Sequence, residues 1–170
     1  MNIYILVLRL VHIFSAVLWA GGTITMAGFI EPTARAAGQE GSRFMQRLGA
    51  GLYSPVMTIA GPLTVLAGLL LYWNDSVGFR QEWILSGPGL GFTVGALFGI
   101  GALSVGLFVT RPAVVGLGAM GKEIQMAGKP PTPEQLAKLA GLSEKLTSAT
   151  VQTAILVSIA LAAMALARYL

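Results

Sequence analysis

The sequence has no cysteine, one histidine and few charged residues, and each scarcity excludes a class of protein. Without cysteine, disulfides, iron–sulfur clusters and thiolate metal sites are excluded. Charged residues make up 11% of the chain, whereas a soluble domain carries about 25%. We therefore expect a membrane protein in contact with the lipid bilayer. The net charge of +4 then reflects topology and lipid headgroups, and we expect no nucleic-acid partner.

The apolar runs also lack acidic residues, because all seven lie in links or at the ends of these runs. Ser–His–Asp chemistry needs an acid beside the histidine, and the glycine-rich segments lack the Lys-Ser/Thr ending of a phosphate loop. A metal site built from a His/Cys/Asp/Glu cluster is excluded on the same ground. The sequence thus gives no reason to expect an enzyme, and we predict no catalytic residue.

Four long apolar segments remain, and each approaches the roughly 20 residues that cross a bilayer as a helix. The first is longer than the apolar part of a signal peptide, so we expect it to stay in the mature protein. The sequence predicts an all-α, integral membrane four-helix bundle, a single domain over residues 1–170. The predicted helices cover about 3–30, 52–73, 90–110 and 133–170, with 150–170 as the membrane part of the last.

The links between these segments predict the orientation of the chain. Eight of the eleven basic residues lie in the first and third links, namely Arg35, Arg43, Arg47, Arg111, Lys122, Lys129, Lys138 and Lys145. Basic links stay in the cytoplasm, so both termini are predicted to face outward. The first link contains a basic amphipathic piece, "SRFMQRLGAGL". Before the last segment, Thr132 and Gln135 predict a capping box with Pro133 at the first helical position. We therefore expect amphipathic cytoplasmic helical extensions.

Glycine is abundant, with 22 residues, and the third segment carries the stripe Gly91–Gly95–Gly99. Such a stripe lets a second helix backbone or a flat ligand approach closely. One interpretation is tight packing within the bundle, or between copies as a homodimer or larger membrane complex. The other is a groove for a planar cofactor, which makes Gly95 and Gly99 candidate cofactor-binding residues.

The stretch "LRLVHIFSAVLWAGG" places Arg9 and His12 on one helix face within an apolar run. By helical rise, Arg9 lies about 9 Å and His12 about 13 Å inside the outer end. Arg9 can reach the headgroups, whereas His12 needs a hydrogen-bond partner, a metal or a water-filled cavity. The alternatives are a histidine bonded to a Ser or Thr of the bundle, an axial ligand of haem b, or a transient copper or proton site. In the haem interpretation Arg9 pairs with a propionate.

One histidine supplies one axial ligand, so a second must be methionine, water or His12 of another copy. Depth favours Met164, about 9 Å from the outer end, over Met57, about 24 Å down. The alternative for both is core filling.

The pattern "LRLVHIFSAVLWAGG…EPTAR" resembles the first helix of bacterial membrane proteins of the CopD and HemJ kind. Those proteins carry a helix of the form L-x-x-x-H-x-x-x-x-x-x-W-x-G-G, here Leu8, His12, Trp19, Gly21 and Gly22. "SPVMTIAGPLTVLAGLLL" is similar to their second helix. The resemblance covers about the first 75 residues and implies the inner membrane of a bacterium. It also implies copper uptake or resistance for CopD-like proteins, and haem b with protoporphyrinogen oxidation for HemJ-like ones.

The third segment lacks the lysine and histidine that HemJ-like proteins carry there, and one buried histidine is thin support for copper transport. The leading hypothesis is therefore a small haem-b-binding membrane protein, active in electron transfer or as an accessory subunit. The alternatives are a non-enzymatic structural or accessory membrane protein, and a copper transport or resistance protein.

Overall fold

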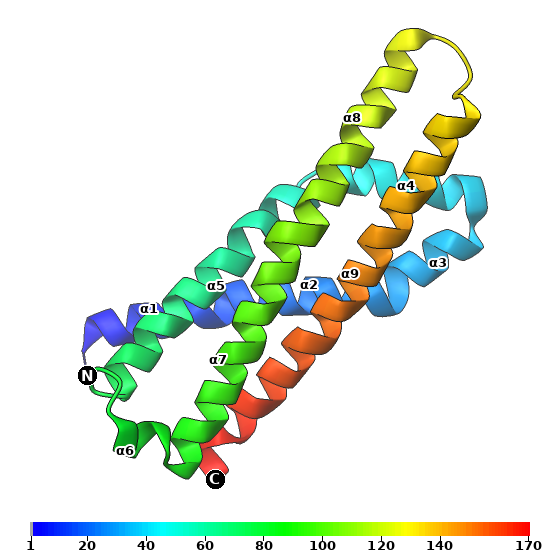
Figure 1. Ribbon diagram of the computed structural model, residues 1–170. Helices are drawn as coiled ribbons and strands as arrows, with labels where there is room; N and C mark the ends of the chain where they lie inside the picture. The colour runs from blue at the N-terminus through cyan, green and yellow to red at the C-terminus, as the bar shows by residue number, and fades with distance from the viewer. Residues whose placement is uncertain (1) are drawn as a thin grey trace.

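The computed structural model describes residues 2–170, and every regular element in this range is a helix. Four of the helices are long and apolar enough to cross a membrane (Figure 1). They form two antiparallel pairs, the first helix with the second and the third with the fourth. The protein is therefore an all-α helical bundle and, by length and composition, a multi-pass membrane protein.

The first long helix is one continuous helical span over Ile3–Ala36. Two π-helical turns interrupt its α-helical hydrogen bonding, so its parts in chain order are α1 (Ile3–Ala16), η1 (Val17–Gly21), α2 (Gly22–Thr25), η2 (Met26–Ile30) and α3 (Glu31–Ala36). Asn2 caps its start, since the Asn2 side chain accepts a hydrogen bond from the backbone N–H of Tyr4 at 3.0 Å.

This helix extends six residues beyond the end predicted at about residue 30, through Pro32. Proline has no backbone N–H, and its ring clashes with the carbonyl four residues earlier in an α-helix. The π-helical turn η2 ends at Ile30, two residues before Pro32. The N–H of Glu31 bonds the carbonyl of Met26, five residues back. The wider turn makes room for the proline ring, so the helix continues.

The third long helix shows the same arrangement and corrects a second predicted boundary. The sequence predicts a helix over about 90–110 that ends at "RP", but the helix runs over Gly87–Ala127. It comprises α7 (Gly87–Val105), the π-helical turn η3 (Gly106–Thr110) and α8 (Arg111–Ala127). Pro112 follows η3 as Pro32 follows η2, and Gly128 ends the helix with φ +60°, a conformation that favours glycine.

The remaining elements connect these helices or pair with them. Helix α4 (Gly38–Ala50) links α3 to α5 (Tyr53–Asp75), and the one-turn helix α6 (Gln81–Ile84) lies between α5 and α7. The fourth long helix is α9 (Pro133–Leu166), which ends in a 3-10 turn, η4 (Ala167–Tyr169). Its start has the predicted capping box: Thr132 Oγ1 accepts from the N–H of Gln135 at 3.2 Å, and the Gln135 side chain accepts from the Thr132 N–H at 3.0 Å.

Helices α5, α6 and α7 meet at the end of the bundle where the chain termini lie (Figure 1), and aromatic side chains of these helices contact one another there. Tyr72 contacts Trp83 edge-on, with ring centroids 5.2 Å apart, and Trp73 contacts Phe79 at 4.9 Å. Aromatic residues gather at membrane–water interfaces, so this cluster marks the level of one interface.

Small residues dominate the centre of the bundle. The buried cluster comprises Trp19, Ala20, Ala60, Ala102 and Val157, drawn from all four long helices. Both termini and the α5–α7 connection lie at one end, and α4 and the tip of the α8–α9 hairpin lie toward the other (Figure 1). The structure thus brings the two basic links to the same end of the molecule, as the charge pattern predicts.

Candidate functional site

The site around His12 lies where α1 packs against α5, at glycines that make room for large side chains. A Cβ atom at Gly61 would lie 3.1 Å from Cε2 of Trp19, and one at Gly68 would lie 2.8 Å from Cε1 of His12. A side chain at Gly61 would push the Trp19 ring by a few tenths of an ångström, and one at Gly68 would force the His12 ring to shift. The histidine ring therefore occupies a place on α5 that a glycine keeps open.

The imidazole of His12 binds the main chain of α5. Its Nδ1 lies 2.8 Å from the carbonyl oxygen of Thr64. A carbonyl oxygen only accepts hydrogen bonds, so Nδ1 donates and carries a proton. In neutral imidazole the other nitrogen, Nε2, is then the one with a free lone pair. His12 is half-buried, and Nε2 makes no hydrogen bond within residues 2–170.

Gly68 makes this hydrogen bond accessible. In a helix, the carbonyl of residue i bonds the N–H of residue i+4, so the Thr64 carbonyl also lies beside Gly68. A carbonyl has two lone pairs and can accept both bonds. Because side chains tilt toward the helix N-terminus, a side chain at position 68 would cover the Thr64 carbonyl.

Two hydroxyls extend the polar contact between α1 and α5. Thr64 Oγ1 lies 2.9 Å from Ser15 Oγ and 2.7 Å from the carbonyl of Ala60. Ser15 Oγ donates to the carbonyl of Val11 at 2.6 Å. Both side chains are buried, and burying a hydroxyl in an apolar setting is costly without such partners. The network fixes the register of α1 on α5, and hence the position of the His12 ring.

The other predicted site residues lie in different surroundings. Arg9 is exposed on α1, one turn toward the N-terminus from His12, and makes no ion pair within residues 2–170. Met164 lies against Gly95, where an added Cβ would be 2.6 Å from Met164 Cγ. Gly99, by contrast, has no atom within 4 Å of its Cβ position.

The predicted glycine stripe is therefore used in part and in a different register. Gly91 faces Ala167, with an added Cβ 2.7 Å from Ala167 Cβ, and Gly87 faces the backbone of Leu170 at 2.4 Å. The stripe that contacts α9 and η4 is thus Gly87–Gly91–Gly95. It brings Met164 and Gly95 together in the α7–α9 pair, whereas His12 belongs to the α1–α5 pair.

Sequence reasoning missed Thr64 and Gly68, although a signal exists. Ala60, Thr64 and Gly68 recur every fourth residue in the second apolar segment and form a stripe of small residues.

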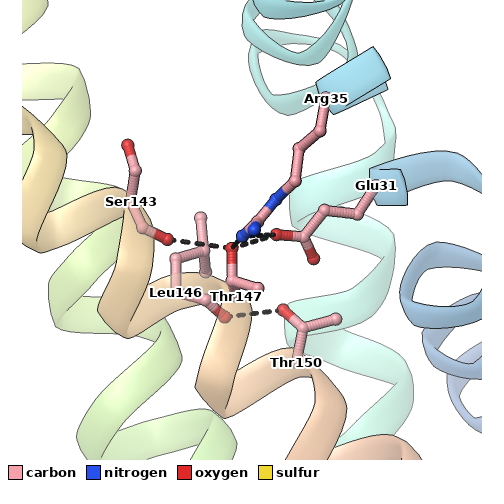
Figure 2. Close-up of polar contacts among 6 residues, drawn as sticks. All are labelled: Glu31, Arg35, Ser143, Leu146, Thr147 and Thr150. Atoms are coloured by element: carbon pink, nitrogen blue, oxygen red, sulfur yellow. Dashed lines mark hydrogen bonds and ion pairs between the residues drawn. The ribbon is translucent and has the colours of Figure 1, made fainter. Parts of the chain in front are cut away.

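Sequence reasoning also missed a polar cluster that joins the first helix to the fourth (Figure 2). There the Thr147 hydroxyl contacts the Glu31 carboxylate and the Arg35 guanidinium.

Within this cluster, Arg35 and Glu31 form an ion pair at 3.2 Å, and the Glu31 side chain is only 14% exposed. Thr147 Oγ1 also bonds the carbonyl of Ser143 at 3.0 Å, one turn earlier on α9. A mostly buried carboxylate needs paired charge and hydrogen bonds, and this cluster supplies both. Among residues 2–170, no three His, Asp or Glu side chains lie close enough together to hold a metal ion.

Comparison of the chain with protein-family models, with curated proteins and with solved structures finds no match. The candidate site therefore rests on the geometry of α1 and α5 alone.

Proposed function

We propose that this protein binds haem b, with Nε2 of His12 as an axial ligand of the iron. The observation that carries the proposal is the hydrogen bond from Nδ1 to the Thr64 carbonyl. Metal-ligating histidines commonly donate their other ring N–H to a carbonyl, which fixes the tautomer and orients the ring. His12 already has this arrangement in the protein alone. Its Nε2 atom then has one lone pair to offer the iron, as axial ligation requires.

A cationic side chain near His12 also supports the proposal. Arg9, exposed and without an ion pair in residues 2–170, lies one turn nearer the chain end. A propionate at that level would gain a charge-assisted hydrogen bond. Bound haem iron would supply one-electron chemistry, and we propose electron transfer, or an accessory role in a larger complex, as the function. The resemblance to CopD-like and HemJ-like proteins supports the same proposal and a place in a bacterial inner membrane, with both termini outside.

A second ligand of the iron is part of the same proposal. Met164 fills the space over Gly95 in the other helix pair, so we propose that water, or His12 of a second copy, would serve as this ligand instead. We further propose that copies associate as a homodimer or join a larger complex through glycine surfaces that the bundle leaves open. Gly21 and Gly28 are of this kind, since both are exposed and neither has an atom within 4 Å of its Cβ position.

The test is the absorbance spectrum of the protein purified from haem-sufficient cells. We expect a Soret band that His12→Ala abolishes and Arg9→Ala retains. Thr58→Val is the matched control, because it removes a hydroxyl of α5 that bonds the Ser54 carbonyl of its own helix at 2.7 Å. We expect Met164→Leu to keep the band as well. A wild-type protein without a Soret band would overturn the proposal, and iron and copper counts on the same sample test the copper alternative.

A second candidate is a structural or accessory membrane protein without a cofactor. The observation that favours it is the fit of the His12 ring on Gly68, which is a packing role in itself. In that case His12→Ala lowers the melting temperature of the purified protein while wild-type protein shows no haem band. The two candidates are therefore separated by the same set of samples.

A further inference from the structure

Helix α4 is short and basic and lies between two membrane-crossing helices. It begins two residues after α3 ends and stops three residues before α5 begins, so both of its ends are held at one end of the bundle. Gly41 is buried against the backbone of Ala34. Because both neighbours cross the bilayer, α4 has no freedom to leave the membrane surface.

One flank of α4 is exposed and combines apolar with basic side chains. Phe44 is 51% exposed, and Leu52, just beyond the helix, is 81% exposed. Arg43 and Arg47 are one turn apart on the polar side, and both are exposed. Met45 and Leu48 are half-buried against the rest of the protein, so Phe44 lies at the border between the packed face and the arginines.

We propose that α4 lies in the headgroup layer of the bilayer, where Arg43 and Arg47 bind the phosphates of anionic phospholipids and Phe44 inserts beside the acyl chains. A helix with apolar and basic residues on adjoining faces is the type that lies in a membrane interface. In water the apolar side chains of Phe44 and Leu52 would stay exposed to solvent. In the membrane interface lipid covers these side chains, and the two arginines lie among the phosphates. Glu40, the one acidic residue of α4, lies in its first turn, where the helix dipole favours it.

Charge complementarity selects anionic over neutral lipid. A basic residue near an anionic surface contributes enough to change affinity about fivefold. We therefore expect Arg43→Gln with Arg47→Gln to weaken phosphatidylglycerol binding by about fivefold per arginine. Binding of phosphatidylcholine, which has no net charge, should not change. The measurement is native mass spectrometry of the detergent-purified full chain, titrated with each lipid.

The matched control removes the positive charge at the tip of the α8–α9 hairpin. The 41 residues of Gly87–Ala127 make a helix of about 60 Å, and the bilayer with its headgroups measures about 40–45 Å. The hairpin tip, where Lys129 lies between α8 and α9, therefore projects roughly 15 Å beyond the headgroups, farther than the Debye length of about 8 Å. Lys129→Gln should leave phosphatidylglycerol binding unchanged, whereas Arg43→Gln alone should weaken it about fivefold. An equal loss in these two single variants would overturn the proposal.

A second measurement tests the position of α4 directly and does not depend on the arginines. The absence of cysteine allows single spin labels at Phe44→Cys and Gln46→Cys, on different sides of α4. In vesicles of phosphatidylcholine and phosphatidylglycerol we expect the label at 44 to be accessible to lipid-soluble oxygen. The label at 46 should be accessible to a water-soluble nickel complex. Water-like accessibility of both labels would show that this flank faces solvent or another protein, and the proposal would be wrong.

Discussion

At the scale of single residues, the partner of His12 explains why an imidazole can lie at this depth. The Thr64 carbonyl accepts the Nδ1 proton, so the ring has a hydrogen-bond partner without an acid or a second histidine. A main-chain acceptor has the further advantage that a side-chain substitution at Thr64 cannot remove it. The position of the ring is then determined mostly by Gly68, which keeps the carbonyl uncovered.

We predict that Gly68→Ala destabilises the protein by about 1–3 kcal/mol, the usual range for overpacking a well-packed site. The added Cβ would lie 2.8 Å from Cε1 and 3.0 Å from Nδ1 of His12, so the ring must shift and its hydrogen bond to the Thr64 carbonyl is strained. Thermal unfolding in detergent measures the loss. Gly101→Ala is the control, since nothing lies within 4 Å of its Cβ position, and it should be neutral or slightly stabilising. Equal melting temperatures for the two variants would contradict the geometry.

Sequence alone singles out His12 and Arg9 as the basic residues of the first apolar run, but it does not predict the group that His12 bonds. Any main-chain carbonyl can accept from a histidine, so the Thr64 carbonyl leaves no signature in residue types. Depth along a helix also says nothing about the direction in which a side chain points. Met164 lies at a depth that suits His12, and the structure places it in the other helix pair, against Gly95.

At the scale of helices, small residues determine how closely α7 and α9 approach. We predict that Gly91→Ala destabilises the protein by about 1–3 kcal/mol, because the new Cβ would lie 2.7 Å from Cβ and 2.8 Å from Cα of Ala167. The backbone atom cannot rotate away as a long side chain can. Gly99→Ala, two turns further along α7, meets no atom within 4 Å and should not destabilise. A comparison of the two melting temperatures decides the register of the stripe.

The apolar runs predict the four long helices, but they do not predict where the first and the third of these helices end. Pro32 and Pro112 both stand where a proline and a charge normally end a helix. The π-helical turns η2 and η3 let the helix continue past each of them. A change from α-helical to π-helical bonding depends on packing around the turn, and residue types within a window do not encode it. By contrast, the Thr132 capping box is entirely local, and the sequence predicts it in full.

At the scale of the whole molecule, the cluster of Glu31, Arg35 and Thr147 joins the first helix to the fourth (Figure 2). Thr147 lies more than one hundred positions from Glu31 and Arg35 in the chain. Glu31 and Arg35 belong to the first helix pair, and Thr147 belongs to the second. The cluster therefore connects the two halves of the bundle at the end opposite the termini. No single segment of the sequence indicates this connection.

We predict that Thr147→Val destabilises the protein by about 1.5–3 kcal/mol, the usual value of a hydrogen bond to a charged group. The substitution keeps the shape of the side chain and leaves Glu31 with fewer partners. Thr150→Val is the matched control, because the Thr150 hydroxyl bonds only the carbonyl of Leu146, at 2.8 Å, within its own helix. Thermal unfolding of both variants in one detergent measures the difference. Equal effects would show that the cluster adds nothing to the association of the halves.

The π-helical turn η2 also determines which way Glu31 faces. A turn bonded from residue i to i+5 holds one residue more than an α-helical turn, and each residue advances a helix by about 100°. Everything after η2 is therefore rotated by about 100° from the direction that an uninterrupted helix would give it. Deletion of one residue from Met26–Ile30 would swing the carboxylate by about 100° away from Thr147. A single extra residue thus decides whether this acid joins the first helix to the fourth.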